Sequence, residues 1–204
     1  MQLENSIKKV VGTISSGGIV CIPTDTLFAL SCDATDQIAV DKLYHIKKRD
    51  KEKKLPIFFR DMKQVQEHCE IPKIALNLTD KFWPGKLTII LKLRENSNIS
   101  RNALDIENSS IAVRVPNNAN VLKILKSVDK PIVGTSANIS GSSNINSYEE
   151  LEEQFKNDDM LIFKPLNYKF KPDIQSTIVS FEDNKPIILR GGAILYDEII
   201  ASTS

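Results

Sequence analysis

The stretch IVCIPTDT, residues 19–26, places three polar side chains directly after a short apolar run. The run is rich in β-branched residues and ends at Pro23, which is typical of a strand buried inside a sheet. Thr24, Asp25 and Thr26 then stand at the end of this strand, where open α/β sheets bind their ligands. The stretch therefore predicts a core strand and, at its end, one wall of a binding site.

Strand and helix patterns alternate on both sides of this stretch. Apolar residues at helical spacing predict a helix before it, and the pattern recurs after it between further short apolar runs. We expect helices over 3–14, 36–48, 72–82, 118–128 and 148–156, and strands over 19–23, 55–59, 87–93, 110–115, 131–136, 160–163, 176–181 and 186–190. No linker rich in Gly, Ser or Pro interrupts the series, so we predict an α/β fold: a single domain over residues 1–204 with a large, mixed β-sheet and flanking helices.

The composition is that of an ordinary globular protein. The 204 residues carry 27 Lys or Arg and 26 Asp or Glu, and 41% of them are hydrophobic. The formal net charge of +1 predicts no global attraction to nucleic acid, so any polyanion site must be local. Cys21, Cys32 and Cys69 share no CxxC spacing and are expected to be reduced thiols rather than metal ligands. No apolar run approaches the roughly 20 residues of a membrane span and no secretory signal is present, so we expect a cytoplasmic protein without membrane contact.

Positive charge is concentrated in the segment KLYHIKKRDKEKK, residues 42–54, which holds seven Lys or Arg against two acidic residues. Charge alone leaves two interpretations open. The segment is a solvated helix end with its loop, or it is a site for a dense polyanion such as a nucleoside triphosphate or RNA.

Several common catalytic motifs are missing. The sequence has no GxxxxGK[ST] loop, no GxGxxG after a strand and no GxSxG elbow, which excludes an ordinary P-loop and a hydrolase triad. Its two histidines, His45 and His68, fall in helical stretches and are expected on the surface or in packing. The sequence thus gives no support for histidine acid–base chemistry or for a zinc site.

Polar residues instead occupy or border several other predicted strands. Arg114 lies inside the apolar stretch SIAVRVP, where a guanidinium is costly to bury unless it meets a carboxylate or a phosphate. Others at strand ends are Ser136, Asn138, Ser176 and Arg190. Caps and structural ion pairs would explain each residue singly, but their shared placement at strand ends equally fits one ligand site.

Seven blocks of the chain, taken together, resemble the signature of one known family. In order they are PTDTLFALSCDA (23–34), KKR (47–49), WPGKLT (83–88), IAVRVP (111–116), TSANISG (135–141), STIV (176–179) and LRGGAI (189–194). These blocks are similar, in the same order, to those of the YrdC/TsaC family of L-threonylcarbamoyladenylate synthases. They extend over most of the chain, which makes the resemblance far more specific than any single motif.

The resemblance implies a twisted α/β sheet curved around a deep, positively charged cavity. It also implies a reaction in which ATP, L-threonine and bicarbonate give threonylcarbamoyl-AMP, pyrophosphate and water. Mg²⁺ would accompany ATP, held mainly by phosphates and water, with no organic cofactor and no metal cage of protein side chains. A separate tRNA threonylcarbamoyl transferase complex would use the product to make N6-threonylcarbamoyladenosine, and weak tRNA or RNA binding is compatible with that role.

The matching motifs also assign residues of this chain. Lys47 and Arg49 of the KKR block, with Ser136 and Asn138 of TSANISG, resemble the family's catalytic tetrad. The positions that fall where the family binds threonine are Thr26, Arg114, Gly134 and Ser176, and those that fall where it binds ATP are Arg49, Lys53, Ser110, Ser136, Asn144 and Arg190. Asp25 has two interpretations of equal weight: it holds the substrate amine or relays its proton, or it caps a turn.

The chain departs from the family pattern near the basic segment. Asp50 stands where proline is common, and Lys53 stands where an asparagine often contacts ATP. Phe58 occupies a position where many members carry a histidine that contacts threonine, so part of the amino-acid pocket is expected to differ. Lys54, like Lys42, Lys48 and Lys51, is expected to be solvated.

Three alternatives to a synthase therefore stay open. They are an RNA-binding YrdC-like module, a diverged paralogue without synthase activity, and a carbamoyl-handling enzyme of the hydrogenase-maturation type. An aromatic content of 6% argues against the first, because single-stranded RNA is usually stacked on exposed aromatic side chains among basic ones.

The chain ends shortly after LRGGAI and so resembles the short form of the family, which lacks the additional C-terminal domain of longer members. Closure over the nucleotide would then come from the chain's own loops. The segments 141–147 and 164–175 are expected to be mobile and lid-like for this purpose.

Overall fold

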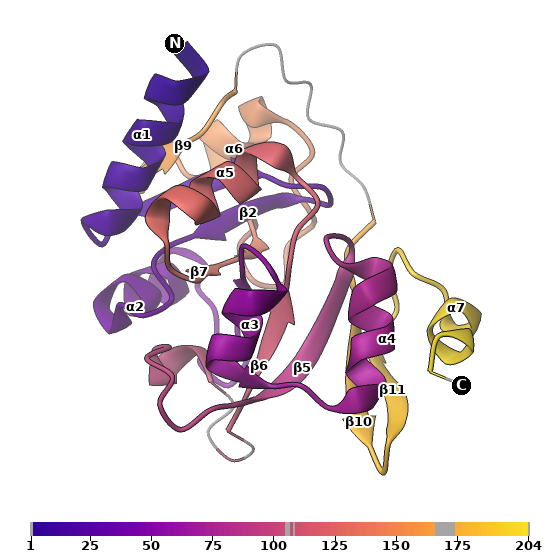
Figure 1. Cartoon of the computed structure of the whole chain (residues 1–204). Helices are drawn as coiled ribbons and strands as arrows, with labels where there is room; N and C mark the ends of the chain where they lie inside the picture. The colour runs from indigo at the N-terminus through magenta and orange to yellow at the C-terminus, as the bar shows by residue number, and fades with distance from the viewer. Residues whose placement is uncertain (1, 105–106, 108, 166–173, 204) are drawn as a thin grey trace.

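The computed structural model describes residues 2–104, 107, 109–165 and 174–203, which form an α/β structure (Figure 1). Its helices are α1 (Gln2–Ser15), α2 (Gln37–Ile46), α3 (Met62–His68), α4 (Lys73–Phe82), α5 (Ala119–Val128), α6 (Tyr148–Gln154) and α7 (Tyr196–Ala201), with a 3-10 turn at Arg101–Ala103. Its strands are β1 (Ile19–Pro23), β2 (Phe28–Ser31), β3 (Pro56–Phe58), β4 (Cys69–Glu70), β5 (Leu87–Leu93), β6 (Ser110–Arg114), β7 (Ile132–Val133), β8 (Thr135–Ser136), β9 (Met160–Ile162), β10 (Thr177–Glu182) and β11 (Lys185–Arg190).

The predicted elements are confirmed, with ends shifted by a few residues, but the strands form two sheets rather than one. One sheet has the order β8-β2-β1-β9, and the other has the order β11-β10-β5-β6-β3-β7 with β4 added on β5. The predicted strand 131–136 is divided between them, because the chain leaves one sheet after β7 and enters the other at β8. Gly134 alone separates β7 from β8, and a Cβ there would lie 2.3 Å from the Phe58 ring. This close approach requires glycine at the crossing point.

The polar residues after β1 lie in a hairpin turn rather than at the open end of a parallel sheet. β1 turns back into β2, which the sequence patterns did not predict, and Pro23 pairs with Phe28 across the hairpin. The Thr24 hydroxyl donates to the Leu27 carbonyl oxygen at 2.7 Å and closes the turn. The turn thus holds Asp25 and Thr26 at a fixed position beside both sheets.

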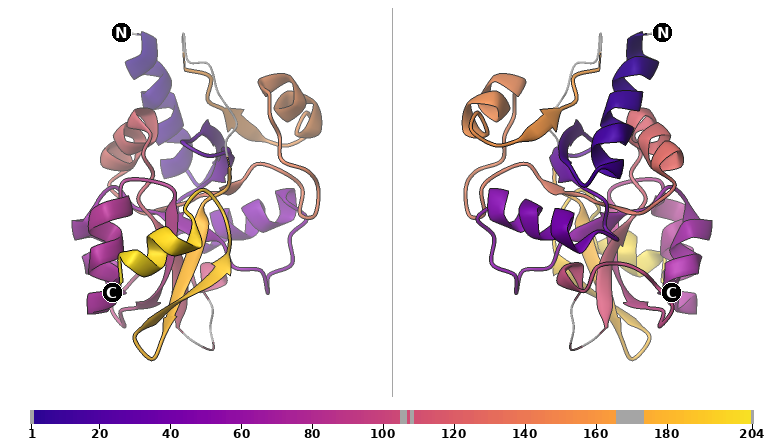
Figure 2. Two further views of the ribbon diagram at one scale, coloured as in Figure 1. Left: turned by 90° about the vertical axis from the view of Figure 1, so that its right-hand side faces the viewer. Right: turned by 90° about the vertical axis from the view of Figure 1, so that its left-hand side faces the viewer.

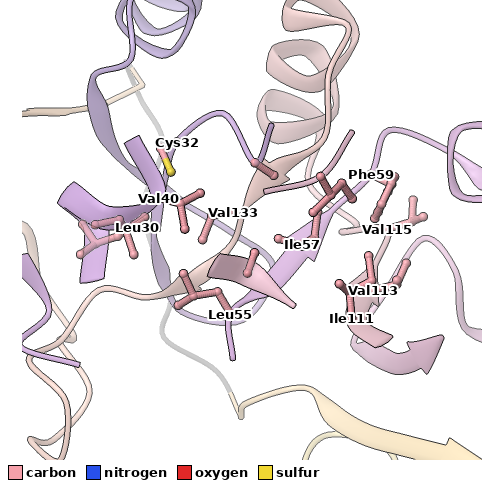
Figure 3. Packing of buried hydrophobic residues seen from close by; sticks show 14 of the residues in the cluster. Leu30, Cys32, Val40, Leu55, Ile57, Phe59, Ile111, Val113, Val115 and Val133 are labelled. Carbon is pink, nitrogen blue, oxygen red and sulfur yellow. The ribbon is translucent and has the colours of Figure 1, made fainter. Parts of the chain in front are cut away.

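Apolar layers cover both faces of the β1–β2 sheet. On one face α1 and α5 lie side by side, and Val10, Ile14 and Ile124 join a cluster with Val20 of β1. On the other face α2 contributes Val40 and Leu43 to the larger core. Figure 3 shows this core running from Leu30, Cys32 and Val40 past Val133 and Ile57 to Phe59, Ile111, Val113 and Val115, so that it joins the two sheets. β1 is buried along its whole length, which explains its uninterrupted apolar sequence.

The C-terminal part of the chain adds the β10–β11 hairpin to the edge of the larger sheet, with α7 lying next to it (Figure 2). β10 runs parallel to β5, pairing Thr177 with Leu87, and this pairing brings the STIV block beside WPGKLT. Of the two predicted lids, 141–147 is an irregular loop beginning at Gly141, whereas residues 166–173 of the second lie outside the described residues. No helix in the described part of the chain is long and apolar enough to cross a membrane.

Candidate functional site

A cavity of about 270 Å³ opens where the two sheets meet. Its wall is built from the β1–β2 turn, the crossing at Gly134, and strands β3, β5, β6, β10 and β11. The predicted site residues in its lining are Thr26, Arg49, Arg114, Gly134, Ser136, Ser176 and Arg190. Residues that are up to 164 positions apart in sequence, from Thr26 to Arg190, therefore share one concave space.

The cavity is cationic. Arg49, Lys54, Arg114 and Arg190 line it, and no carboxylate is among the described lining residues. Burial lowers the pKa of Arg190, and the nearby positive charges of Arg114 and Arg49 lower it further. Since like charges gathered in one hollow are costly, the arrangement favours an anionic ligand.

At one end of the cavity, Arg114 is held on three sides. Its Nη2 lies 2.8 Å from Asp25 Oδ2, its Nη1 donates to Thr26 Oγ1 at 2.9 Å, and its Nε donates to the Gly85 carbonyl oxygen at 2.8 Å. The Phe58 ring lies against the guanidinium, 5.7 Å from its carbon to the ring centre. Burial lowers the pKa of Arg114, while the Asp25 charge acts to raise it. The guanidinium is thus fixed in direction and paired with a carboxylate before any ligand arrives.

Asp25 supports this end from outside the cavity lining. Its side chain is 10% exposed, and its contact with Arg114 is an ion pair without hydrogen-bond geometry. Neither carboxylate oxygen accepts a hydrogen bond in the described structure. Asp25 therefore neutralises Arg114 and keeps unused acceptor capacity, which is unusual for a buried carboxylate.

The hydroxyl of Thr26 has a defined hydrogen-bond direction. Thr24 uses its own hydroxyl hydrogen for the Leu27 carbonyl oxygen, so in the 3.1 Å contact between Thr24 and Thr26 the donor is Thr26. Thr26 Oγ1 accepts from Arg114 at the same time. What Thr26 offers the cavity is consequently an acceptor lone pair rather than a hydrogen.

At the other end of the cavity lies the predicted tetrad, which the structure brings together. Lys47 follows the last residue of α2, is 1% exposed, and directs its Nζ to the carbonyl oxygens of Ser136 and Asn138, the latter at 2.7 Å. The Ser136 hydroxyl donates to Asn138 Oδ1 at 2.6 Å, and Asn138 Nδ2 donates to the Ser142 carbonyl oxygen at 2.7 Å. Ser136 lines the cavity, whereas Lys47 and Asn138 lie outside the lining and support it.

Burial and the nearby Arg49 lower the pKa of Lys47 to about 7 from its usual 10.5. Its Nζ donates to two carbonyl oxygens, and no carboxylate compensates its charge in the described structure. Two of the amine's positions are occupied by these donations, and the third carries either a hydrogen or a lone pair. An anion placed at this third position would favour the charged form.

The Arg49 side chain forms hydrogen bonds to the backbone of the basic segment, residues 42–54. Its Nε donates to the Lys53 carbonyl oxygen at 2.8 Å and its Nη2 to the Lys54 carbonyl oxygen at 2.9 Å. Arg49 and Lys54 line the cavity, whereas the Lys53 side chain is exposed outside it and Lys51 pairs with Asp41 on the surface. Some cations of the segment thus line the cavity and others face solvent, and its role as a polyanion site stays a prediction. Lys54 differs from the expectation that it is only solvated, since it is half-buried and lines the cavity.

Ser176 belongs to a hydroxyl pair that the sequence did not predict. Its Oγ lies 2.8 Å from Thr88 Oγ1, and Arg190 Nη2 donates both to that Oγ at 3.1 Å and to the Ser176 carbonyl oxygen at 2.8 Å. Thr88 is 1% exposed and lines the cavity. A threonine in an apolar strand is typical of β-sheet preference alone, so no separate sequence signal points to Thr88.

Two other predicted ATP residues lie apart from this cavity. Ser110 lines a neighbouring hollow of about 660 Å³, which shares Ile90 and Leu189 with the first cavity. Asn144 is half-buried in the loop after the tetrad and is not part of the lining. Their nucleotide contacts stay predictions.

Metal-binding side chains do not gather in the described part of the chain, where no group of three or more His, Cys, Asp or Glu could hold an ion. Burial raises the pKa of the thiols of Cys21, Cys32 and Cys69. These thiols are therefore protonated and poor ligands at neutral pH.

Comparison with known proteins gives a consistent result. A family model for Sua5, YciO and YrdC proteins, described as "Telomere recombination", matches residues 12–192. A Methanocaldococcus jannaschii protein, provisionally named threonylcarbamoyl-AMP synthase, is 34% identical over 187 residues, which cover 89% of this chain and 83% of that protein. The threonylcarbamoyl-AMP synthase of Pyrococcus abyssi is 30% identical over 96% of this chain and 56% of its own length.

Solved structures agree with these relatives. The crystal structure of P. abyssi Sua5 complexed with L-threonine superposes with a TM-score of 0.85 at 29% identity, covering 96% of this chain and 56% of that one. The T. kodakarensis HypF structure superposes with a TM-score of 0.77 at 25% identity, covering 91% of this chain but 24% of that one. The described chain thus corresponds to about half of the P. abyssi protein and to a much smaller part of HypF.

Proposed function

Because this chain belongs to the Sua5/YciO/YrdC family, we propose that it makes threonylcarbamoyl-AMP from L-threonine, bicarbonate and ATP and releases pyrophosphate. One observation carries the proposal: Arg114, which is paired with a carboxylate, lines the same cavity as Arg49, Lys54 and Arg190, which form no ion pair with a carboxylate among the described residues. The first suits a small zwitterion, and the second suits a polyphosphate. Threonylcarbamoyl-AMP synthase is also the name of the P. abyssi relative.

The amino acid is proposed to bind at the Arg114 end. A guanidinium whose direction is already fixed is well suited to a substrate carboxylate, because little side-chain entropy is lost on binding. Two of the five N–H groups of Arg114 donate hydrogen bonds internally and a third faces Asp25 in the ion pair, which leaves two for a ligand. Thr26 and Ser176 belong to the same lining as small polar partners, and Gly134 borders the same space.

Asp25 is proposed to stay near the substrate amine. Its two oxygens accept no hydrogen bond in the described structure, so they have capacity for the hydrogens of an ammonium group or for a proton in transit. Since it also neutralises Arg114, Asp25 would keep the amino-acid end close to zero net charge. A zwitterion fits such an environment better than a polyanion does.

ATP is proposed to place its phosphates at the Lys47 end. Lys47 lies behind the lining next to Ser136, and Arg49, Lys54 and Arg190 line the cavity itself. Two unit charges about 4 Å apart repel by roughly 4 kcal/mol at an effective dielectric of 20, so bringing bicarbonate and a triphosphate together requires fixed cations. Lys53 and Asn144, with Ser110 in the adjoining hollow, would contact the remainder of the nucleotide, and Mg²⁺ would arrive bound to the phosphates.

The chemistry needs no nucleophile from the protein. The neutral amine of threonine attacks bicarbonate, or CO₂ derived from it, and N-carboxythreonine forms with loss of water. The new carboxylate then attacks the α-phosphate of ATP, and the bond to pyrophosphate breaks. The protein's part is to hold the reactants close and to stabilise the charge that develops on phosphorus, which Lys47, Arg49 and Arg190 are placed to do.

The product is a reactive mixed anhydride, so an acyl-accepting step must follow. We expect a separate tRNA threonylcarbamoyl transferase complex to take the threonylcarbamoyl group to adenosine in tRNA. The basic residues exposed around the cavity would also allow weak tRNA or RNA contact.

Pyrophosphate release from ATP tests the proposal directly. L-threonine, L-serine and L-valine are each supplied with and without bicarbonate, and RNA binding is measured at low and high salt. We expect release to require both bicarbonate and an amino acid, with threonine strongly preferred. Pyrophosphate release that does not depend on the amino acid or on bicarbonate would indicate another activity within the fold family. No release, together with tight RNA binding that weakens at high salt, would indicate a binding module.

A further inference from the structure

Thr88 and Ser176 form an isolated pair of hydroxyls in the wall of the cavity. Their oxygens are 2.8 Å apart, and both residues line the cavity while being 1% and 7% exposed. In the described structure the one other hydrogen bond to this pair comes from Arg190 Nη2, which donates to Ser176 Oγ at 3.1 Å. The pair therefore has a hydrogen-bond balance that can be counted.

One hydroxyl hydrogen of the Thr88–Ser176 pair is not used in the contact between the two side chains. The two hydroxyls have two hydrogens, and the contact between them uses one. If Thr88 donates to Ser176, the hydrogen of Ser176 is free; if Ser176 donates to Thr88, the hydrogen of Thr88 is free. In either case one hydroxyl hydrogen of the pair is left for a ligand, and Arg190 occupies a lone pair of Ser176 that would otherwise accept from that ligand.

We propose that Thr88 is a positioning residue of the amino-acid site, which orients the Ser176 hydroxyl so that the pair presents one donor to an acceptor oxygen of the substrate. The proposal rests on the proposed function for the identity of the amino acid. Thr26, by contrast, presents an acceptor, because its hydrogen goes to Thr24 and it accepts from Arg114. The cavity lining thus presents an acceptor at Thr26 and a donor at the Thr88–Ser176 pair, which together would favour one orientation of a bound amino acid.

Two substitutions at the same position separate the hydroxyl from its packing. Thr88→Val removes the hydroxyl and keeps the shape, whereas Thr88→Ser keeps the hydroxyl and removes a methyl group. A matched control is Thr79→Val in α4, since the buried Thr79 hydroxyl donates to the Leu76 carbonyl oxygen at 2.8 Å and does not line the cavity. All variants are checked by thermal unfolding.

We expect Thr88→Val to weaken L-threonine binding and to raise its KM about tenfold, the loss of one oriented hydrogen bond, while kcat and the KM for ATP change less than twofold. Thr88→Ser and Thr79→Val should stay within about twofold of the wild type. L-threonine binding is measured by calorimetry as well as through KM. If the protein binds threonine but releases no pyrophosphate, the proposed reaction is rejected, and the effect of Thr88→Val on threonine binding still tests the role of Thr88.

L-2-aminobutyrate, which lacks the hydroxyl of threonine, identifies the acceptor. Equal weakening of both ligands by Thr88→Val assigns the substrate carboxylate, and weakening of L-threonine alone assigns its hydroxyl oxygen; both results support the proposal. Unchanged threonine binding in Thr88→Val overturns it. So does an equal loss in Thr88→Ser, because packing rather than the hydroxyl would then be the cause.

Discussion

The two ends of the site each contain a buried basic residue, Arg114 at one and Lys47 at the other, but the charges are compensated differently. Arg114 is paired with Asp25, whose carboxylate lies 2.8 Å from its Nη2. Lys47 and Arg49 donate to backbone carbonyl oxygens, and burial lowers the pKa of both. One end is thus neutral before a ligand binds, and the other retains positive charge that only a ligand can balance.

This difference indicates where each substrate fits and how each end affects the stability of the folded protein. A neutral end can be rigid and stable by itself, since its charges compensate each other. A cationic end without carboxylates destabilises the empty protein and gains most when an anion arrives. Substitutions at the two ends should therefore separate activity from stability.

The largest expected effect is loss of activity in Lys47→Met. Removal of the ammonium group should reduce pyrophosphate release by about 10²–10³-fold, the usual result of deleting one group that stabilises transition-state charge. The free energy of unfolding should not fall, because the replaced charge has no carboxylate partner in the described structure. Lys42→Met is the control, since Lys42 pairs with the exposed Asp159 at the surface. Near-normal activity in a folded Lys47→Met protein would remove Lys47 from the tetrad.

Asp25→Asn should have the opposite effect to Lys47→Met: the main loss should be in the free energy of unfolding. It leaves the buried Arg114 without its counter-ion, and breaking such pairs costs about 3 kcal/mol or more in the free energy of unfolding. Urea unfolding measures the change, and the KM for threonine should rise as Arg114 loses its fixed direction. The control is Asp41→Asn, because Asp41 and Lys51 form a half-exposed pair worth at most about 1 kcal/mol. Equal small losses in both variants would mean that Arg114 does not depend on Asp25.

A smaller effect should appear in the pH dependence of stability. The pKa of Lys47 is about 7 in the folded chain and 10.5 when unfolded, so below pH 7 both states are protonated and the folded state bears the full cost of the buried charge. Between these values the unfolded state binds more protons, and the free energy of unfolding rises with pH. The free energy of unfolding of Lys47→Met relative to the wild type should thus decrease by about 3 kcal/mol from pH 6 to pH 9. A difference that is constant with pH would show that Lys47 stays charged.

Sequence patterns predicted most elements of this fold because apolar periodicity reflects burial directly. The strand over 87–93 has the predicted bounds, and the helices α4 and α5 begin within one residue of prediction. β2 was missed, since it is only four residues long and so short a run cannot be assigned by periodicity alone. The division of residues 131–136 between two sheets occurs at Gly134, whose close approach to the Phe58 ring is a tertiary contact that no local pattern contains.

The candidate site was predictable to the extent that its residues lie in motifs. The KKR and TSANISG blocks do meet in space, through the donation of Lys47 to two carbonyl oxygens. Thr88 and Lys54 could not be singled out, because their roles depend on which neighbour faces the cavity after folding. The sequence likewise gave no sign that Ser110 would line an adjoining hollow.

The Gly134 crossing has a consequence for redesign. Its backbone N–H donates to the Pro56 carbonyl oxygen at 2.8 Å, which holds the crossing residue against β3 of the larger sheet. The backbone position of this part of the lining is consequently a property of the scaffold and not of a rotamer. Phe58 is the adjustable neighbour of Gly134 in the lining, and exchanging it for a smaller aliphatic residue is the direct way to admit a bulkier amino acid without rebuilding either sheet.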